Sequence, residues 1–240
     1  MVLFWKYSKA FTRIYWKRRF FPDLLGKISM SYILKFLPND PVILDVGAHI
    51  GIDSEYFAKH FKEGQIFALE PVPELFQLLA LRMARYNNCK LFQVGLAEFN
   101  GSARIYVSSG TSDASSSLLI PKEHLKFHPE VKFEAFKEIQ VQTLDEFIFN
   151  QNIKGIDLLW LDIQGLEPAV LRKSYKALRQ IKLIHTEVNF VETYNGAELF
   201  QEFDLFLKSH GFRLLKLNKD FKDQGNALYL NNFFGRDNKA

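Results

Sequence analysis

The stretch VILDVGAHIG, residues 42–51, decides the fold of this chain. It begins with the apolar run Val42-Ile43-Leu44, which favours a buried strand, and a helical pattern follows it. Asp45 stands at the end of that strand. Gly47 and Gly51 let the backbone turn and approach a ligand closely, because glycine carries no Cβ. A strand, a glycine turn and a helix in this order predict a nucleotide-type pocket.

A second acid follows the next predicted strand. Glu70-Pro71 come directly after the apolar run 65–69, so Glu70 stands where an acid would bind the two hydroxyls of a ribose. The dinucleotide fingerprint GxGxxG needs a glycine at the position of His49, and a carboxylate at the turn would repel a pyrophosphate. A nicotinamide dehydrogenase is therefore disfavoured. The expected ligand carries positive charge near Asp45 and a ribose near Glu70, and S-adenosylmethionine has both.

Composition predicts one domain and no nucleic-acid partner. With 240 residues, 48% of them hydrophobic, the chain can bury one good core. Six basic residues and no acid fall within residues 1–20, so a formal net charge of +4 for the whole chain leaves −2 for the rest. A near-neutral body argues against a nucleic-acid groove.

The single cysteine and the lack of long apolar stretches indicate the cellular compartment. Cys89 is the single cysteine, which excludes an intramolecular disulfide and a multi-cysteine zinc site and fits a reducing compartment. No stretch reaches the roughly 18 apolar residues of a spanning helix. Basic residues interrupt the N-terminus, where a signal peptide would need an apolar core. We therefore expect a cytoplasmic protein.

Residues 1–40 are expected to form a basic, aromatic, helical appendage, followed by the main domain over residues 41–232 and a tail over residues 233–240. Up to Pro22, aromatic side chains recur at helical spacing with lysine and arginine on another side. The aromatic face of this helix would dock onto the domain as a cap. The alternative is peripheral contact of residues 1–20 with the inner surface of an anionic membrane.

From residue 41 onward, short apolar runs alternate with amphipathic helical patterns. This alternation predicts an α/β fold with a doubly wound, mostly parallel sheet covered on both faces, and its last two strands are expected to pair antiparallel. The predicted strands are 42–46, 65–69, 90–95, 102–107, 138–141, 156–161, 181–188, 212–217 and 227–230. The predicted helices are 52–62, 73–87, 143–150, 168–178 and 197–210.

Polar residues gather at the predicted strand ends. In a doubly wound sheet the ligand lies outside the carboxyl ends of the strands, so the residues just past each strand should line one cleft. They are Asp45, Glu70, Gly95, Asp162 and Glu187. One acid after a strand is about as often the N-cap of the next helix, but four at one edge indicate a site.

An ordered set of motifs, over residues from about 40 to 231, resembles the FkbM-type methyltransferases. The motifs are DVGAHIG (45–51), EPVP (70–73), the Ser115-Ser116 region, VQTLDEF (141–147), DLLWLDIQGLEPAVL (157–171), HTEVN (185–189) and GNALYL (225–230). The resemblance implies a Rossmann-like class I methyltransferase domain, S-adenosylmethionine as the donor, and O-methylation of hydroxyls on sugars, glycolipids or related small metabolites. One departure is Gln164, where the family usually has a glutamate; this weakens any metal site built on that carboxylate, and no metal is expected.

The resemblance also implies roles for individual residues. Asp45, Gly47, His49 and Gly51 would form the loop that holds the methionine part of the donor, and Glu70 and Pro71 would bind the ribose. Gly95 and Leu96 would border the adenine. Asp162 would bind the ammonium group of the donor or accept the proton of the acceptor. A base is needed because an alcohol is a poor nucleophile, although alignment supplies much of the rate. Asp162 ranks first as that base, Glu187 second and His185 third. A core histidine is the plainer account of His185.

The predicted insertion, between residues 102 and 141, contains a run of hydroxyl side chains from Ser108 to Ser117. It is either a lid that closes over the site or a solvated connection, and His124 and His128 are candidates to touch the acceptor. The alternative function for the whole chain is a non-catalytic, membrane-associated binding module on the same fold. The residues do not specify an oligomeric state.

Overall fold

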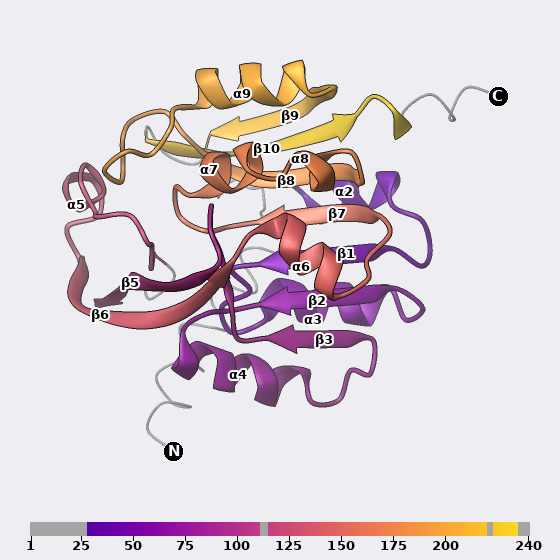
Figure 1. The fold of residues 1–240 in the computed structure, drawn as a ribbon, viewed down its shortest axis with the longest axis horizontal. Coiled ribbons are helices and arrows are strands. Elements are labelled where there is room, and N and C mark those ends of the chain that lie inside the picture. The colour runs from indigo at the N-terminus through magenta and orange to yellow at the C-terminus, as the bar shows by residue number, and fades with distance from the viewer. Residues whose placement is uncertain (1–27, 111–114, 220–222, 235–240) are drawn as a thin grey trace.

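The computed structural model describes residues 28–110, 115–219 and 223–234, and a seven-stranded sheet lies at its centre (Figure 1). The strand order is β3-β2-β1-β7-β8-β10-β9. The bounds are β1 (Val42–Val46), β2 (Gln65–Leu69), β3 (Cys89–Phe92), β7 (Ile156–Leu161), β8 (Ile181–Asn189), β9 (Phe212–Lys219) and β10 (Gln224–Asn231). Neighbouring strands are parallel except that β10 runs antiparallel to both β8 and β9. The predicted sheet, mostly parallel with an antiparallel last strand, is confirmed.

Helices cover both faces of this sheet. On one face are α2 (Met30–Ile33), the 3-10 turn η2 (Leu34–Phe36), α3 (Ile52–His60) and α4 (Pro73–Met83). On the other are α6 (Leu144–Asn150), α7 (Glu167–Arg172), α8 (Tyr175–Leu178) and α9 (Phe200–Ser209). The first crossover helices, α3 and α4, lie on one face and the later helices on the other, as in a doubly wound fold.

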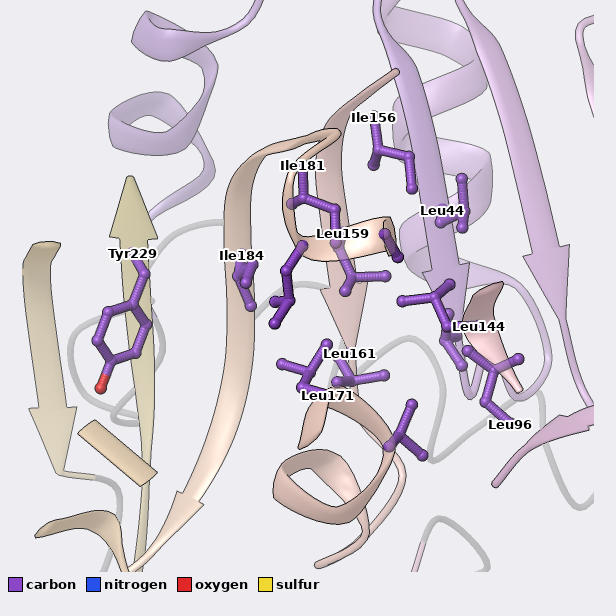
Figure 2. Close-up of a cluster of buried hydrophobic side chains, with 14 of the residues drawn as sticks. Leu44, Leu96, Leu144, Ile156, Leu159, Leu161, Leu171, Ile181, Ile184 and Tyr229 are labelled. Atoms are coloured by element: carbon purple, nitrogen blue, oxygen red, sulfur yellow. The ribbon is translucent and has the colours of Figure 1, made fainter. Parts of the chain in front are cut away.

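Alternation along each strand explains why both faces are apolar. In β7, Leu158 and Trp160 pack with the α3 side, whereas Leu159 and Leu161 pack with the α6 side. Successive side chains of a strand point to opposite faces, so a sheet covered twice needs a continuous apolar run. Figure 2 shows Leu159 and Leu161 packed with Leu44 of β1 and Leu171 of α7.

A second, three-stranded sheet stands beside the carboxyl ends of the main strands. Its order is β4-β6-β5, and the bounds are β4 (Gly95–Leu96), β5 (Gly101–Gly110) and β6 (Val131–Gln142). The antiparallel pair β5–β6 extends to one side of the molecule, where α5 (His124–Phe127) lies (Figure 1). The predicted insertion is therefore a long hairpin rather than a loop between two short strands, because its outward side chains are polar and hide the strand pattern.

Several predicted elements have different bounds in the structure. The strand predicted over 90–95 divides, because β3 ends at Phe92 and Gly95–Leu96 pairs with β6 instead. The helix predicted over 73–87 ends at Met83. The helix predicted over 168–178 divides into α7 and α8 at Ser174, whose hydroxyl donates to the carbonyl of Val170 at 2.6 Å and so satisfies a backbone acceptor at the helix end. The helix predicted over 197–210 begins only at Phe200.

Residues 28–37 are built into the core. Ile28 and Ile33 are buried in the apolar cluster on the α3 side, together with Leu228 and Leu230 of β10. This part of the predicted 1–40 appendage therefore contributes to the main domain. The basic aromatic helix expected before Pro22 lies outside the described residues.

Candidate functional site

A pocket of about 600 Å³, partly open to solvent, lies at the carboxyl ends of the strands, between the main sheet and the second sheet. Residues from seven segments line it: Val46, Gly47, His49, Glu70, Pro71, Val72, Leu75, Val94, Gly95, Leu96, Ile105, Ser116, Ser117, Leu118, Ile139, Asp162, Ile163, Gln164 and Leu166. Seven residues that the sequence nominates are among them: Gly47, His49, Glu70, Pro71, Gly95, Leu96 and Asp162.

The loop after β1 takes three left-handed backbone conformations in five residues. Gly47 and Gly51 have φ of 80° and His49 has φ of 53°. A Cβ on Gly47 would lie 2.0 Å from the backbone oxygen of Asp162, and one on Gly51 would lie 2.5 Å from Cδ1 of Leu79. Both glycines are therefore required by space as well as by conformation. Gly51 itself does not line the pocket; it lets α3 begin against α4.

Glu70 braces this loop from the neighbouring strand. Its Oε2 accepts a hydrogen bond from the backbone N–H of His49 at 2.8 Å, and its Oε1 accepts from that of Val72 at 2.9 Å. The carboxylate is buried yet lines the pocket. Because each carboxylate oxygen has a second lone pair, both can still accept a hydrogen bond from a ligand hydroxyl. Glu70 thus fixes the loop and fits a ribose at the same time.

Asp45 points away from the pocket. It lies within β1, where its neighbours in register are Ala68 and Trp160, and its Oδ2 accepts a hydrogen bond from the hydroxyl of Ser54 on α3. Burial, with smaller contributions from nearby carboxylates, raises the pKa of Asp45 to about 8. Its side chain is 1% exposed and does not line the pocket. The structure therefore ties Asp45 to the start of α3 rather than to the pocket surface.

One wall of the pocket is apolar and comes largely from the second sheet. Gly95 and Leu96 lie on β4, and Ile105 and Ile139 reach the pocket from β5 and β6. A Cβ on Gly95 would meet Ile139 and Val141 at 3.4 Å and Pro71 at 3.5 Å. This close approach makes a flat apolar slot that fits a planar base such as adenine.

The loop after β7 supplies the polar end of the pocket. Asp162 and Gln164 both line it, and Gln164 Nε2 donates to Asp162 Oδ1 at 2.7 Å. Gln164 has φ of 56°, and Gly165 follows with φ of 97°. The loop is braced from within, because the carboxylate of Glu167 accepts from the backbone N–H of Ile163 and of Gly165, each at 2.8 Å. Burial raises the pKa of Glu167 to about 7 against the lowering effect of these hydrogen bonds.

The other two candidate bases lie apart from the pocket lining. His185 is buried in the sheet, and its ring stacks on Trp160 with centroids 3.7 Å apart. Glu187 Oε1 accepts a hydrogen bond from Gln224 Nε2 at 2.6 Å. Asp162, ranked first in the sequence, is the one of the three that lines the pocket.

Part of the serine run closes one side of the pocket. Ser116 and Ser117 line it, and the Ser117 hydroxyl donates to the backbone oxygen of Gln164 at 2.8 Å. Ser117 also pairs with Tyr106 as an isolated bridge. His128 lies elsewhere: its Nε2 is 3.4 Å from Oδ2 of the buried Asp223.

Sequence reasoning missed three features of this site. Ile105 and Ile139 have only the alternation of a half-buried strand to mark them. Glu167 directly precedes the helix predicted over 168–178 and was not nominated, although an acid two residues after a glycine turn is well placed to accept its N–H groups. Tyr194, whose hydroxyl lies 3.1 Å from Gln164 Oε1, has no sequence signal, because it comes from a loop more than 25 residues away.

A doubly wound sheet with an antiparallel last strand, whose second strand ends in a pocket-lining acid, defines a Rossmann-like class I methyltransferase. Residues 45–214 match the family model described as the Methyltransferase FkbM domain, and the chain belongs to that family. The donor expected from the sequence, S-adenosylmethionine, is thereby confirmed.

Individual relatives agree with the family assignment. The 2-O-methyltransferase NoeI of Sinorhizobium fredii (strain NBRC 101917 / NGR234) is 32% identical over 162 residues, which cover 65% of this chain and 67% of NoeI. Methyltransferase sdnD of Sordaria araneosa is 24% identical over 77% of this chain and 78% of its own length. Among solved structures, Aeropyrum pernix fibrillarin in complex with natively bound S-adenosyl-L-methionine has a TM-score of 0.49 at 12% identity, over 86% of this chain and 71% of that one.

The described part of the chain contains neither a candidate membrane-spanning helix nor a candidate metal-binding cluster. Within residues 28–110, 115–219 and 223–234, no helix is long and apolar enough to cross a membrane. In those same ranges, no three His, Cys, Asp or Glu side chains gather in a way that could hold a metal ion.

Proposed function

We propose that this protein is an O-methyltransferase that methylates a hydroxyl of a sugar, a glycolipid or a related small metabolite. The observation that carries the proposal is Asp162, a carboxylate that lines the donor pocket at its polar end beside Gln164. Ser116 and Ser117 add hydroxyl groups on the same side. Such a lining suits a polyhydroxylated acceptor, and the name of NoeI as a 2-O-methyltransferase supports an oxygen as the acceptor atom.

The donor-binding roles follow the pocket lining. Glu70, beside Pro71, would accept hydrogen bonds from the ribose hydroxyls, and Gly95 and Leu96 would border the adenine. Gly47 and His49 would give the methionine part a close approach to backbone. Asp45 and Gly51 would support the site without contacting the donor, since they hold the loop after β1 and the start of α3 in place. The donor supplies an electrophilic methyl group on a sulfonium.

For the base, we rank Asp162 first, Glu187 second and His185 third. Asp162 lies in the pocket, whereas Glu187 is bound to Gln224 and His185 is stacked on Trp160. A carboxylate within hydrogen-bond reach of the acceptor hydroxyl accepts its proton as the oxygen attacks. The pocket walls supply alignment, which is the larger part of the rate for an in-line displacement.

Two measurements test the proposed function. Calorimetric titration with S-adenosylhomocysteine should show tight binding by the parent and a large loss for Glu70→Ala. Incubation with labelled donor and extracted cellular glycans should then transfer label, and Asp162→Asn should slow the transfer by about 100-fold or more. Binding without transfer to any hydroxyl compound would instead support a binding module that has kept the fold.

We also propose peripheral contact between residues 1–20 and the inner membrane surface of a reducing compartment. The six basic side chains of this segment and the single cysteine support it. Deletion of residues 1–20 should reduce sedimentation with vesicles rich in anionic lipid while leaving the affinity for S-adenosylhomocysteine intact. A deletion that lowers the melting temperature of the main domain would favour the cap instead.

A further inference from the structure

Four groups form a continuous chain of hydrogen bonds that begins in the pocket. Asp162 Oδ1 accepts from Gln164 Nε2 at 2.7 Å, and Gln164 Oε1 lies 3.1 Å from the Tyr194 hydroxyl. That hydroxyl also lies 3.0 Å from the backbone oxygen of Ser115. Gln164 is 9% exposed and Tyr194 is buried, so the geometry of these bonds is fixed by packing. We call these four groups the Gln164 chain.

The Tyr194 hydroxyl has more acceptors than it can serve at once. It carries one hydrogen, and both Gln164 Oε1 and the Ser115 carbonyl accept it. When Tyr194 donates to Gln164, the amide N–H₂ of Gln164 points at Asp162, which suits an ionised carboxylate. When Tyr194 donates to Ser115 instead, its oxygen is open to accept from Gln164. The chain therefore has two complete arrangements.

The second arrangement suits a protonated Asp162. If the Gln164 amide turns over, its Oε1 accepts the new O–H of Asp162, its Nε2 donates to Tyr194, and Tyr194 donates to Ser115. Every donor then again meets an acceptor, and no charge is added to the buried part of the chain. An acidic residue at position 164 would lack this property, because it would place a second carboxylate beside Asp162.

We propose that Gln164 and Tyr194 are positioning residues that hold Asp162 ionised before methyl transfer and reverse their hydrogen bonds to keep its proton afterwards. This rests on the proposed function. In the step itself, the acceptor oxygen forms a bond to the methyl carbon, the carbon–sulfur bond breaks with its electron pair going to sulfur, and the acceptor proton passes to Asp162.

Other carboxylates lie near the Gln164 chain and affect the protonation of its tyrosine. The phenol of Tyr194 is close enough to Glu187, Glu167 and Asp162 that these carboxylates, after burial itself, raise its pKa. Tyr194 is thus kept as a neutral donor. Glu167 is occupied by the two backbone N–H groups of its own loop. The neutral amide of Gln164 separates these acids from Asp162 on the tyrosine side.

A pair of donor analogues tests the proposal without an acceptor. S-adenosylhomocysteine lacks the methyl group, whereas sinefungin carries an ammonium group where the methyl group would be. An ionised Asp162 directed at that point should favour sinefungin, so the ratio of the two dissociation constants reports how Asp162 is held. The titrations use the full chain between pH 6 and pH 8.5.

In the parent protein we expect sinefungin to bind at least about 10-fold more tightly than S-adenosylhomocysteine. Gln164→Met should reduce this preference by about 10-fold, because it removes the hydrogen bond to Asp162 itself, and Tyr194→Phe by about 3-fold, because it removes only the bond that holds Gln164. Gln164→Glu should make the preference depend on pH between 6 and 8.5, because two adjacent carboxyl groups share a proton.

The matched control is Gln224→Met. Gln224 is also 9% exposed and also donates its amide to an acid, Glu187 of β8, at 2.6 Å. This variant should keep the parent's preference for sinefungin. A preference that changes in Gln224→Met, or that stays the same in Gln164→Met and Tyr194→Phe, would overturn the proposal. If neither analogue binds the parent, the proposed function fails first, and the two failures are thereby distinguished.

Discussion

The loops after β1 and after β7 lie side by side and are built alike, yet they do different work. Each has a non-glycine residue in the left-handed region, His49 at φ 53° and Gln164 at φ 56°. Each has a buried glutamate that accepts two backbone N–H groups, Glu70 in the first and Glu167 in the second. The braces differ in origin, because Glu70 comes from the next strand whereas Glu167 belongs to the loop that it holds.

This difference separates binding from chemistry. Glu70 lines the pocket while it braces the first loop, and under the proposed function the same carboxylate would also bind the donor. Glu167 is fully buried, which leaves Asp162 of the second loop available to the pocket. Because Glu167 braces its own loop, Asp162 at the strand end is left available to the pocket. Because Glu70 braces a neighbouring loop, the bracing carboxylate itself becomes part of the pocket.

The largest effect should come from the point where the two loops touch. Gly47→Ala would place a Cβ 2.0 Å from the backbone oxygen of Asp162, so both loops must shift. We expect a loss of about 3 kcal/mol or more in unfolding free energy and no measurable S-adenosylhomocysteine binding, by urea denaturation and calorimetry. Gly196→Ala is the control, because Gly196 has the same φ of 80° with nothing within 4 Å of the added Cβ. Equal losses in both variants would show that strain, not contact between the loops, is responsible.

The two braces should separate cleanly in a paired experiment. Glu70→Ala should weaken S-adenosylhomocysteine binding by about 100-fold, since it removes a pocket carboxylate and frees the His49 turn. Glu167→Ala should lower the melting temperature about as much as Glu70→Ala does. It should change the affinity for S-adenosylhomocysteine by less than about 3-fold, because Glu167 does not line the pocket. Comparable affinity losses in the two variants would remove the distinction between the loops.

The pH dependence of stability should reveal the acid beneath the first loop. Burial raises the pKa of Asp45 to about 8, above its ordinary 3.8. The folded state therefore binds the extra proton between about pH 4 and pH 8, and the contribution of Asp45 to stability falls as the pH rises through that window. Asp45→Asn cannot ionise, so its unfolding free energy relative to the parent should rise from pH 5 to pH 8 by up to about 3 kcal/mol, at roughly 1.4 kcal/mol per pH unit.

Glu55→Gln provides the contrast for this pH series. Against the raising effect of burial, hydrogen bonds from Arg85, Lys59 and other neighbours lower the pKa of Glu55 to about 2, from 4.5. Its stabilising contribution is fully present above pH 4.5 and is lost only as the pH falls toward 2. The difference between Glu55→Gln and the parent should therefore stay flat from pH 5 to pH 8. A slope in this variant would mean that a general change in charge, not Asp45, sets the dependence.

The smallest effect on stability is expected at an ion pair near the segment that carries Tyr194, which contacts the loop after β7. The exposed ion pair between Lys122 and Glu192 joins the region of α5 to the segment that carries Tyr194. Lys122→Ala should cost no more than about 0.5 kcal/mol of stability, measured by urea denaturation. Lys126→Ala, which breaks a pair with Glu123 inside the same region, should match it. A loss well above this from Lys122→Ala alone would mean that the pair holds the Tyr194 segment in place.

The sequence predicted the parts of the site that lie next to a strand end. Gly47, Glu70 and Asp162 follow apolar runs directly, and the position of a residue after a parallel strand determines the sheet edge at which it lies. The same rule placed Asp45 at the pocket, whereas β1 continues to Val46 and turns the Asp45 side chain toward α3. A shift of one residue in a strand moves a side chain to the other face.

The rest of the site depends on contacts that no local pattern records. Tyr194 reaches Gln164 from a loop after β8, and β4 leaves the main sheet to pair with β6. The hairpin of β5 and β6 was recognised only at its ends, where Ile105 and Ile139 alternate with polar residues. Its middle gives no clear alternation, because apolar and polar side chains, such as Phe136 and Lys132, are both exposed there.

The dependence of the pocket on Ile105 and Ile139 has a consequence for protein engineering. The hairpin that carries them is the natural segment to exchange between relatives when a new acceptor is wanted, since it is long and variable surface structure of this kind usually tolerates replacement. Here the same segment forms one wall of the pocket, on the side where we propose that the adenine lies. A chimera that imports a foreign hairpin would therefore inherit a foreign affinity for the methyl donor, and the two traits would have to be retuned together.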